Sequence, residues 1–173
     1  MKQSSLKINK SEKEFLIHLL KDGHKNDAEI AKEVSMSKSS IHRIRQKLEN
    51  SGVIADYIPI IDLDKIGVNV FFVVMFEWQS FEDEALTKKS FSDIQKDNHV
   101  VFFGNGEGSE GHTSVLFLGF RDVYEYTLYF REFRKKYGKS VGHISSFMIP
   151  SKEILKNDFT GLARDAVENI RVM

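Results

Sequence analysis

The feature that most constrains the fold is the segment 68–78, in which nearly every side chain is apolar. An antiparallel strand with one face toward solvent alternates apolar and polar residues. Phe71–Phe76 does not alternate, and neither do the segments 115–118 and 147–149. Both faces of these strands are therefore predicted to be buried, so the sheet that contains them needs a cover on each side.

The segments around these strands predict the order βαββαβ, which is the ferredoxin-like plan. Two of them carry apolar residues at helical spacing, with anchors such as Phe91 in the first and Phe133 in the second. The predicted elements are strands over 68–78, 100–103, 115–120 and 144–149 and helices over 81–96 and 123–137. Two helices cover only one face of such a sheet. A second copy of the same sheet is the simplest cover for the other face, so the sequence predicts a homodimer.

The residues before the sheet predict three helices. Asn9 and Glu12 have the spacing of a capping box at the start of the first. Asp27 is predicted to cap the second helix and Ser37 the third, which Gly52 ends. Two short helices joined by a tight turn are the helix-turn-helix arrangement, which binds DNA through its second helix.

The helix that begins after Ser37 has the chemistry of a DNA-binding helix. Ile41, Ile44 and Leu48 lie on one face and are expected to pack inward. From Ser37 to Leu48 the sequence holds four Lys or Arg residues and no acid, so the opposite face suits a major groove. The predicted DNA-binding residues are Ser37, Lys38, Ser39, Ser40, His42, Arg43, Gln46 and Lys47. The alternative is a solvated helix face. Arg45 projects closer to the buried stripe, so we expect it to lie along the core or to meet a phosphate.

Composition supports a globular protein with two modules. The chain is 41% hydrophobic and 29% charged, and its net charge of zero divides into +3 over residues 1–60 and −3 over 61–173. No cysteine is present, which excludes disulfides, thiolate catalysis and cysteine-ligated metals. The start, residues 1–5, leads into no signal-peptide core, so a cytoplasmic location is expected. The predicted domains are 1–57 (helix-turn-helix), 58–67 (linker), 68–150 (ferredoxin-like) and 151–173 (C-terminal helical extension).

Residues 14–67 resemble the N-terminal half of the Lrp/AsnC (feast/famine) transcription regulators. The resemblance rests on Leu19-Leu20-Lys21-Asp22-Gly23, Ala28-Glu29-Ile30-Ala31, Ser37-x-Ser39-Ser40-Ile41, Leu48-Glu49-x-x-Gly52-Val53-Ile54 and Asp62-x-x-Lys65-x-Gly67. It implies an α+β fold: an N-terminal winged helix-turn-helix domain, then a ferredoxin-like (RAM-type) domain, with a strand over 53–58 between them. It also implies a sequence-specific regulator of double-stranded DNA that needs no cofactor and forms dimers or higher oligomers.

The turn between the second and third strands has two interpretations. In the family that the chain resembles, this turn helps form a pocket for amino-acid effectors, usually with a Gly and an Asp. Here it is longer and has no Asp, and the corresponding residues are Gly104, Gly106, Glu107 and Glu110. The glutamates either pair with an effector's amino group or belong to a solvated acidic loop. The pattern G-x-G-x-x-G over Gly106–Gly111 is not a dinucleotide site, because a strand rather than a helix follows it.

The sequence points to no catalytic or metal-binding residues. The main alternative is an enzyme, because siroheme decarboxylases resemble both modules and use His and Arg on the sheet domain, where this chain has His143 and Arg121. A further alternative is a small-molecule sensor that regulates by assembly. His99 and His112 should lie at opposite ends of a hairpin, about 17 Å apart, too far to share a metal ion. His112 and His143 could approach one another, but they lack accompanying carboxylate ligands.

The C-terminal extension predicts one amphipathic helix. Leu155, Phe159, Leu162, Ala166 and Ile170 fall on one helical face. We expect this face to pack on the dimer or on the linker.

Overall fold

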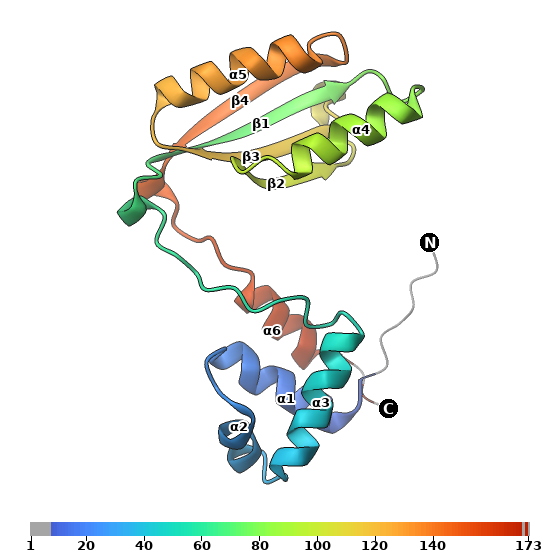
Figure 1. Ribbon diagram of the computed structural model, residues 1–173, viewed down its shortest axis with the longest axis vertical. Coiled ribbons are helices and arrows are strands. Elements are labelled where there is room, and N and C mark those ends of the chain that lie inside the picture. The colour runs from blue at the N-terminus through green and yellow to red at the C-terminus, as the bar shows by residue number, and fades with distance from the viewer. Residues whose placement is uncertain (1–7, 171, 173) are drawn as a thin grey trace. The chain divides into compact units, whose positions relative to one another are not determined.

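The computed structural model describes residues 8–170 and 172, and these form two compact units (Figure 1). The described residues of the first, the helical unit, fall within Met1–Ile60 and Asn157–Met173. The second, the sheet unit, spans Ile61–Lys156. The chain start that bears on signal peptides, residues 1–5, lies outside the described residues. Among those that are described, no helix is both long and apolar enough to cross a bilayer.

The helical unit begins with α1 (Lys10–Lys21), α2 (Asp27–Glu33) and α3 (Lys38–Asn50). The capping box of α1 is confirmed: the Glu12 amide donates to Asn9 Oδ1 over 2.9 Å, and the Asn9 amide donates to Glu12 Oε2 over 3.0 Å. Ser37 caps α3 as predicted, since its Oγ accepts from the Ser40 amide. The predicted cap of α2 is wrong. Asn26 fills that position and Asp27 is the first helical residue, whose carboxylate faces α3 instead.

Residues 53–58, directly after α3, form no strand, contrary to the prediction. The α3 helix ends at Asn50, and Gly52 adopts a φ of 73°, which favours glycine. The amides of Val53 and Ile54 then both donate to the Leu48 carbonyl. Their side chains pack against the helical core, so the backbone here is used to close the helix end and is not free to pair as a strand.

The C-terminal helix, α6 (Thr160–Glu168), packs on α1, a partner that the expected packing on the dimer or the linker did not include. Its contact face is also different from the predicted one. Val167 and Ile170 pack against the helical core, whereas Leu162 is 69% exposed. Of the predicted stripe, Leu155, Phe159, Leu162 and Ala166 are exposed and only Ile170 packs inward. The segment has two apolar stripes, and pattern alone does not decide which of them finds a partner.

The sheet unit holds four strands in the order β2-β3-β1-β4. The strands are β1 (Val70–Trp78), β2 (Val100–Asn105), β3 (Ser114–Phe120) and β4 (Val141–Pro150), all antiparallel, with helices α4 (Glu84–Gln95) and α5 (Val123–Tyr137). Ile94 of α4 and Phe133 of α5 pack in one core with Val74 and Leu118, so both helices cover the same face (Figure 1). The ferredoxin-like fold is therefore confirmed.

The other face of the sheet is apolar, and neither α4 nor α5 covers it. A row of side chains crosses it, because Val73 pairs with both Phe117 and Phe147, and Phe117 pairs with Phe102. The exposed fraction is 66% for Phe147 and 53% for Phe102. We call this surface the open face. It corresponds to the uncovered side that the non-alternating strands predict.

Candidate nucleic-acid interface

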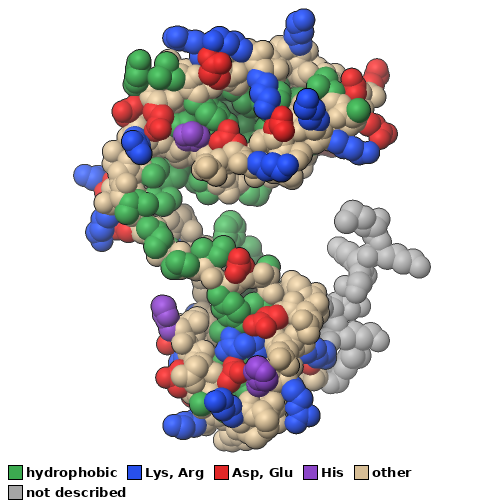
Figure 2. Space-filling view, viewed as in Figure 1, with side chains coloured by type: hydrophobic (Ala, Val, Ile, Leu, Met, Phe, Trp, Pro, Cys, Tyr) green, Lys and Arg blue, Asp and Glu red, His purple; other side chains and the backbone are tan. Residues whose placement is uncertain are grey.

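The α3 helix presents the predicted face to solvent. Ile41 and Leu48 are buried in the helical core, at 0% and 2% exposure, and Ile44 is half-buried beside them. On the other side, all of the predicted DNA-binding residues are exposed apart from Ser40, which is half-buried. Basic side chains are visible on the helical unit in Figure 2, where they are coloured blue. The arrangement leaves a cationic helix face accessible along its length.

The predicted residues differ in how far the protein itself already uses them. Over the described part of the chain, Lys38, Arg43 and Gln46 make no side-chain hydrogen bond or ion pair. Ser37 is occupied as the N-cap, and its Oγ also lies 3.0 Å from that of Ser39. The residues without protein partners are therefore the ones whose donors can turn fully to a nucleic acid.

Lys47 is held by a carboxylate of α1. Its Nζ lies 2.5 Å from Glu12 Oε1, and Glu12 is only 3% exposed whereas the Lys47 side chain is 61% exposed. The same glutamate completes the capping box with Asn9. Sequence reasoning identified Lys47 and Glu12 separately and missed their pairing, because 35 residues separate them. Lys47 can reach a phosphate only while sharing its charge with Glu12.

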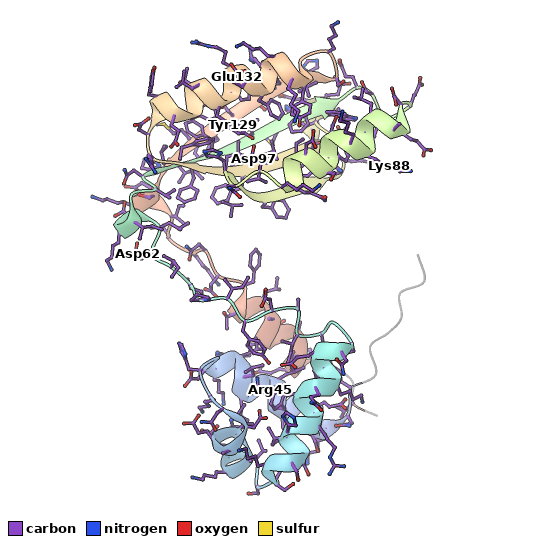
Figure 3. All side chains as sticks on the ribbon, in the orientation of Figure 1. Arg45, Asp62, Lys88, Asp97, Tyr129 and Glu132 are labelled. Carbon is purple, nitrogen blue, oxygen red and sulfur yellow. The ribbon has the colours of Figure 1, made fainter. Side chains whose placement is uncertain are left out.

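The Arg45 side chain is held by contacts within the helical unit (Figure 3). Its Nε donates to Asp27 Oδ1 over 2.6 Å, and its Nη1 donates to the Tyr57 hydroxyl over 2.6 Å. The guanidinium also lies over the Phe15 ring, 5.1 Å from its centroid. The expectation that Arg45 lies along the core is thus met, and its position close to the buried stripe was the signal for it. Asp27 and Tyr57 as its partners were not predicted.

Asp27 connects α2 to two residues of α3. In addition to Arg45, it meets His42, whose Nδ1 lies 3.1 Å from Asp27 Oδ2. Burial raises the pKa of Asp27, but the hydrogen bonds and charges of Arg45 and His42 outweigh burial and leave this pKa below its ordinary value. His42, although exposed, is therefore oriented by α2. The contacts of Asp27 with Arg45 and His42 fix the rotation of α3 about its own axis relative to α2, and therefore the direction of the cationic face.

We expect Asp27→Ala to lower the free energy of unfolding of the helical unit by about 2–3 kcal/mol, because Arg45 then lies half-buried without its carboxylate. Since the folded pKa of Asp27 is depressed, its contribution is present above the unfolded pKa of about 3.9 and is lost as the pH falls through the lower folded value. Urea unfolding monitored by far-ultraviolet circular dichroism, once near neutral pH and once near pH 3, measures the loss of stability and its dependence on pH. Trp78, the only tryptophan, reports on the sheet unit, and its transition should not move.

Glu14→Ala is the matched control for this experiment. Glu14 is an acid of the same unit with a side chain that is 43% exposed and lies 4.0 Å from Lys10, and surface pairs of this kind contribute little. If Asp27→Ala and Glu14→Ala reduce stability equally near neutral pH, Asp27 does not hold Arg45 in the way described.

The candidate effector residues lie on the ordered hairpin between β2 and β3. Gly104 is in β2, and Glu107 and Glu110 are exposed beyond it. The loop includes a short 3-10 helix, Ser109–Gly111, and the Gly106 amide donates to the Thr113 carbonyl over 3.0 Å. The structure brings these residues into one hairpin, with both carboxylates at the surface.

His112 fastens this hairpin to the sheet. It is only 7% exposed; its Nδ1 lies 2.8 Å from the Ser109 carbonyl, and its Nε2 lies 2.9 Å from Ser145 Oγ of β4. Both ring nitrogens are therefore occupied by the protein. Sequence reasoning considered His112 only as a metal ligand and missed this anchoring role. Among the described residues, no group of three or more His, Asp or Glu side chains is placed to hold a metal ion.

The residues of the enzyme alternative lie far apart in the sheet unit. Arg121 follows Phe120, which pairs with Val70, whereas His143 follows Gly142, which pairs with Glu77. Seven residues of β1 separate the two points, about 23 Å at the rise of an extended strand. Within one chain, the two side chains do not form one substrate site.

A family model described as winged helix-turn-helix DNA-binding matches residues 8–55. Many solved structures with the same fold are AsnC or Lrp transcription regulators. An AsnC-family regulator from Agrobacterium tumefaciens is 23% identical with a TM-score of 0.72, and the match covers 82% of this chain and 90% of that one. AsnC from Escherichia coli is 14% identical with a TM-score of 0.71, covering 88% and 95%. A transcriptional regulator from Neisseria meningitidis, solved in complex with L-Met, is 14% identical with a TM-score of 0.70, covering 82% and 89%. No curated protein matches the chain.

Proposed function

We propose that this chain, which has the fold of the AsnC and Lrp transcription regulators, is itself a sequence-specific regulator of transcription that binds double-stranded DNA in the cytoplasm. The observation that carries the proposal is the cationic face of α3, which is directed to solvent in the second helix of a helix-turn-helix and has no acid between Lys38 and Leu48. The match of residues 8–55 to a DNA-binding family model supports it.

The contacts made by each residue follow from its chemistry. Arg43 and Gln46 have unoccupied donors and lengths that reach base edges in a major groove. Ser39 and His42 lie on the same face, closer to the helix start. Lys38 and Lys47 would both bind phosphates. These contacts fix the position of the helix on the duplex but do not distinguish one base sequence from another. Ser37 and Ser40 stabilise the first turn of α3, and the amides of this turn would face the phosphate backbone of the DNA.

The open face supports a homodimer as the functional form. A row of large apolar side chains on an otherwise folded sheet is the kind of surface that a second copy buries. Two copies of α3 related by a two-fold axis would read two half-sites about 34–36 Å apart or a multiple of this distance. Linkage of the two units then gives tight binding from two modest contacts.

The hairpin that carries Glu107 and Glu110 is the proposed effector-binding element. The similar regulator from Neisseria meningitidis was solved with L-Met, an amino acid, and exposed carboxylates suit the amino group of such a ligand. His112 holds the hairpin against β4, so the loop is already ordered before a ligand arrives. The function requires no catalytic step, and the separation of Arg121 from His143 argues against a decarboxylase.

Selection of bound fragments from random duplex DNA tests the proposed function. Purified protein should enrich a two-fold symmetric sequence whose half-sites are separated by about 10 base pairs or a multiple of it. Enrichment of no sequence, even in dilute salt, would contradict the proposal.

The salt dependence of binding separates the two lysines. We expect Lys38→Gln to weaken binding to all sequences and to reduce the slope of log K against log salt by about 0.9, the value for one phosphate. Lys47→Gln should reduce this slope by less, because Glu12 already neutralises part of its charge. Fluorescence anisotropy over a salt series measures both slopes, with exposed Lys21→Gln on α1 as the control. Equal slopes for all three variants would place both lysines away from the DNA backbone.

A further inference from the structure

The chain passes between the two units twice. The first crossing, residues 58–62, leads from the helical unit into the sheet unit, and the second crossing, residues 154–158, returns to the helical unit. Neither has regular secondary structure. Five fully extended residues span at most about 18 Å, so each crossing is a short connection.

Both crossings leave the sheet unit at the same place. Val70 at the start of β1 pairs with Pro150 at the end of β4. Just outside this pair, the Ser151 amide donates to the Asn69 carbonyl over 2.9 Å, and Ser151 Oγ donates to Asp64 Oδ1 over 2.5 Å. The two connections therefore share one origin on the sheet unit.

At the helical unit the crossings attach to different helices. The first begins after Tyr57, whose hydroxyl is held on α3 by Arg45 and by Glu49 Oε1, the latter 3.0 Å away. The second leads into α6, which is docked on α1. Val167 packs against the helical core there, and Lys13 Nζ donates to the carbonyls of Glu168 and Ile170 over 2.5 and 3.3 Å. A cation at the end of α6 also favours the helix dipole.

Two attachments restrict motion in a way that one does not. A body joined to another by a single flexible segment can turn about all axes. A second segment, attached elsewhere on the same body, limits how far the body can turn before one of the two segments is fully extended. The second attachment depends on the docking of α6 on α1, because the described residues after the second crossing contact the helical core through this helix and Ile170.

We propose that docking of α6 on α1 restricts the orientation of the DNA-binding unit and thereby sets the half-site spacing that the protein accepts. The effect on DNA rests on the proposed function, whereas the effect on orientation does not. Val167 and Lys13 are the positioning residues. They act through α1 and lie outside the predicted DNA-binding face of α3.

The first part of the test measures orientation without DNA. The chain has no cysteine, so Lys32→Cys on α2 and Lys139→Cys in the sheet unit, both exposed, can carry the only two spin labels. The labelled protein is diluted with unlabelled protein, so that the distance distribution measured by pulsed electron resonance is that of one chain. Val167→Asp should at least double the width of this distribution. Leu162→Asp, which places the same charge on the exposed face of α6, should leave it unchanged. Equal widths would overturn the proposal.

The second part measures DNA binding with the selected spacing and with about half a helical turn added. We expect the unmodified protein to lose about 100-fold in affinity on the longer DNA and Val167→Asp about 10-fold, with affinity for one half-site unchanged. Equal losses would overturn the spacing role while leaving the proposed function intact, whereas absence of binding by any form would contradict the proposed function. If circular dichroism shows that Val167→Asp unfolds the helical unit, Lys13→Ala takes its place in both parts.

Discussion

Phe147→Asp is expected to convert the protein to a monomer and to lower its affinity for a two-half-site DNA by about 100-fold or more, because binding then loses the linkage between two DNA-binding units. Phe147 is 66% exposed in the single chain, so the substitution should leave the fold intact. In a two-fold interface it places two carboxylates in an apolar row with Val73 and Phe117. Desolvating them should remove about 4 kcal/mol or more of association free energy.

Sedimentation equilibrium and DNA binding of the same samples measure these effects. Tyr124→Asp is the matched control, since Tyr124 is an aromatic residue of α5 with 70% exposure on the covered side of the sheet. A Phe147→Asp protein that remains dimeric, or one matched by Tyr124→Asp, would show that the open face is not the dimer interface.

Arg43→Ala should reduce affinity for the selected sequence by about 10- to 100-fold, the loss of one bidentate contact worth about 1–3 kcal/mol. Affinity for unrelated DNA should fall far less, and the preference at one base position should relax. Stability should change by less than about 0.5 kcal/mol, because Arg43 is exposed and makes no side-chain hydrogen bond or ion pair within the described residues.

Competition binding with selected and unrelated duplexes measures the effect of Arg43→Ala. Lys32→Ala, on the exposed side of α2, serves as its control. An unchanged ratio of specific to non-specific affinity would remove Arg43 from the base-reading face and would require a different orientation of α3.

The fold was predictable from the sequence where an apolar pattern could pack in only one way. Non-alternating strands such as Phe71–Phe76 indicated a sheet with two apolar faces, and the stripe of Ile41 and Leu48 oriented α3 correctly. The cap of α2 was not predictable, because Asn26 and Asp27 are both good capping residues and local sequence does not favour one strongly. Asp27 is used by Arg45 and His42, and this choice depends on the folded arrangement of α2 and α3.

The solvent-exposed face of α3 was predictable from the sequence, but the polar contacts around it were not. The positions on α3 follow from helical periodicity, whereas the pairing of Lys47 with Glu12 joins residues far apart in the chain. The same limit applies to α6, whose two apolar stripes make its rotation ambiguous until α1 is present. Long-range partners of polar and amphipathic residues are thus the part that pattern alone did not supply.

The position of α6 has a consequence for the order of synthesis. Because α6 packs on the helical core, the sheet unit is an insertion within the DNA-binding unit, and α1 to α3 are synthesised before the helix that packs on α1. A nascent chain can therefore form its sheet, and meet a second nascent copy, before its DNA-binding unit is complete. Chains that end before residue 157 would lack α6 and with it the packing of Val167 and Ile170 on the helical core.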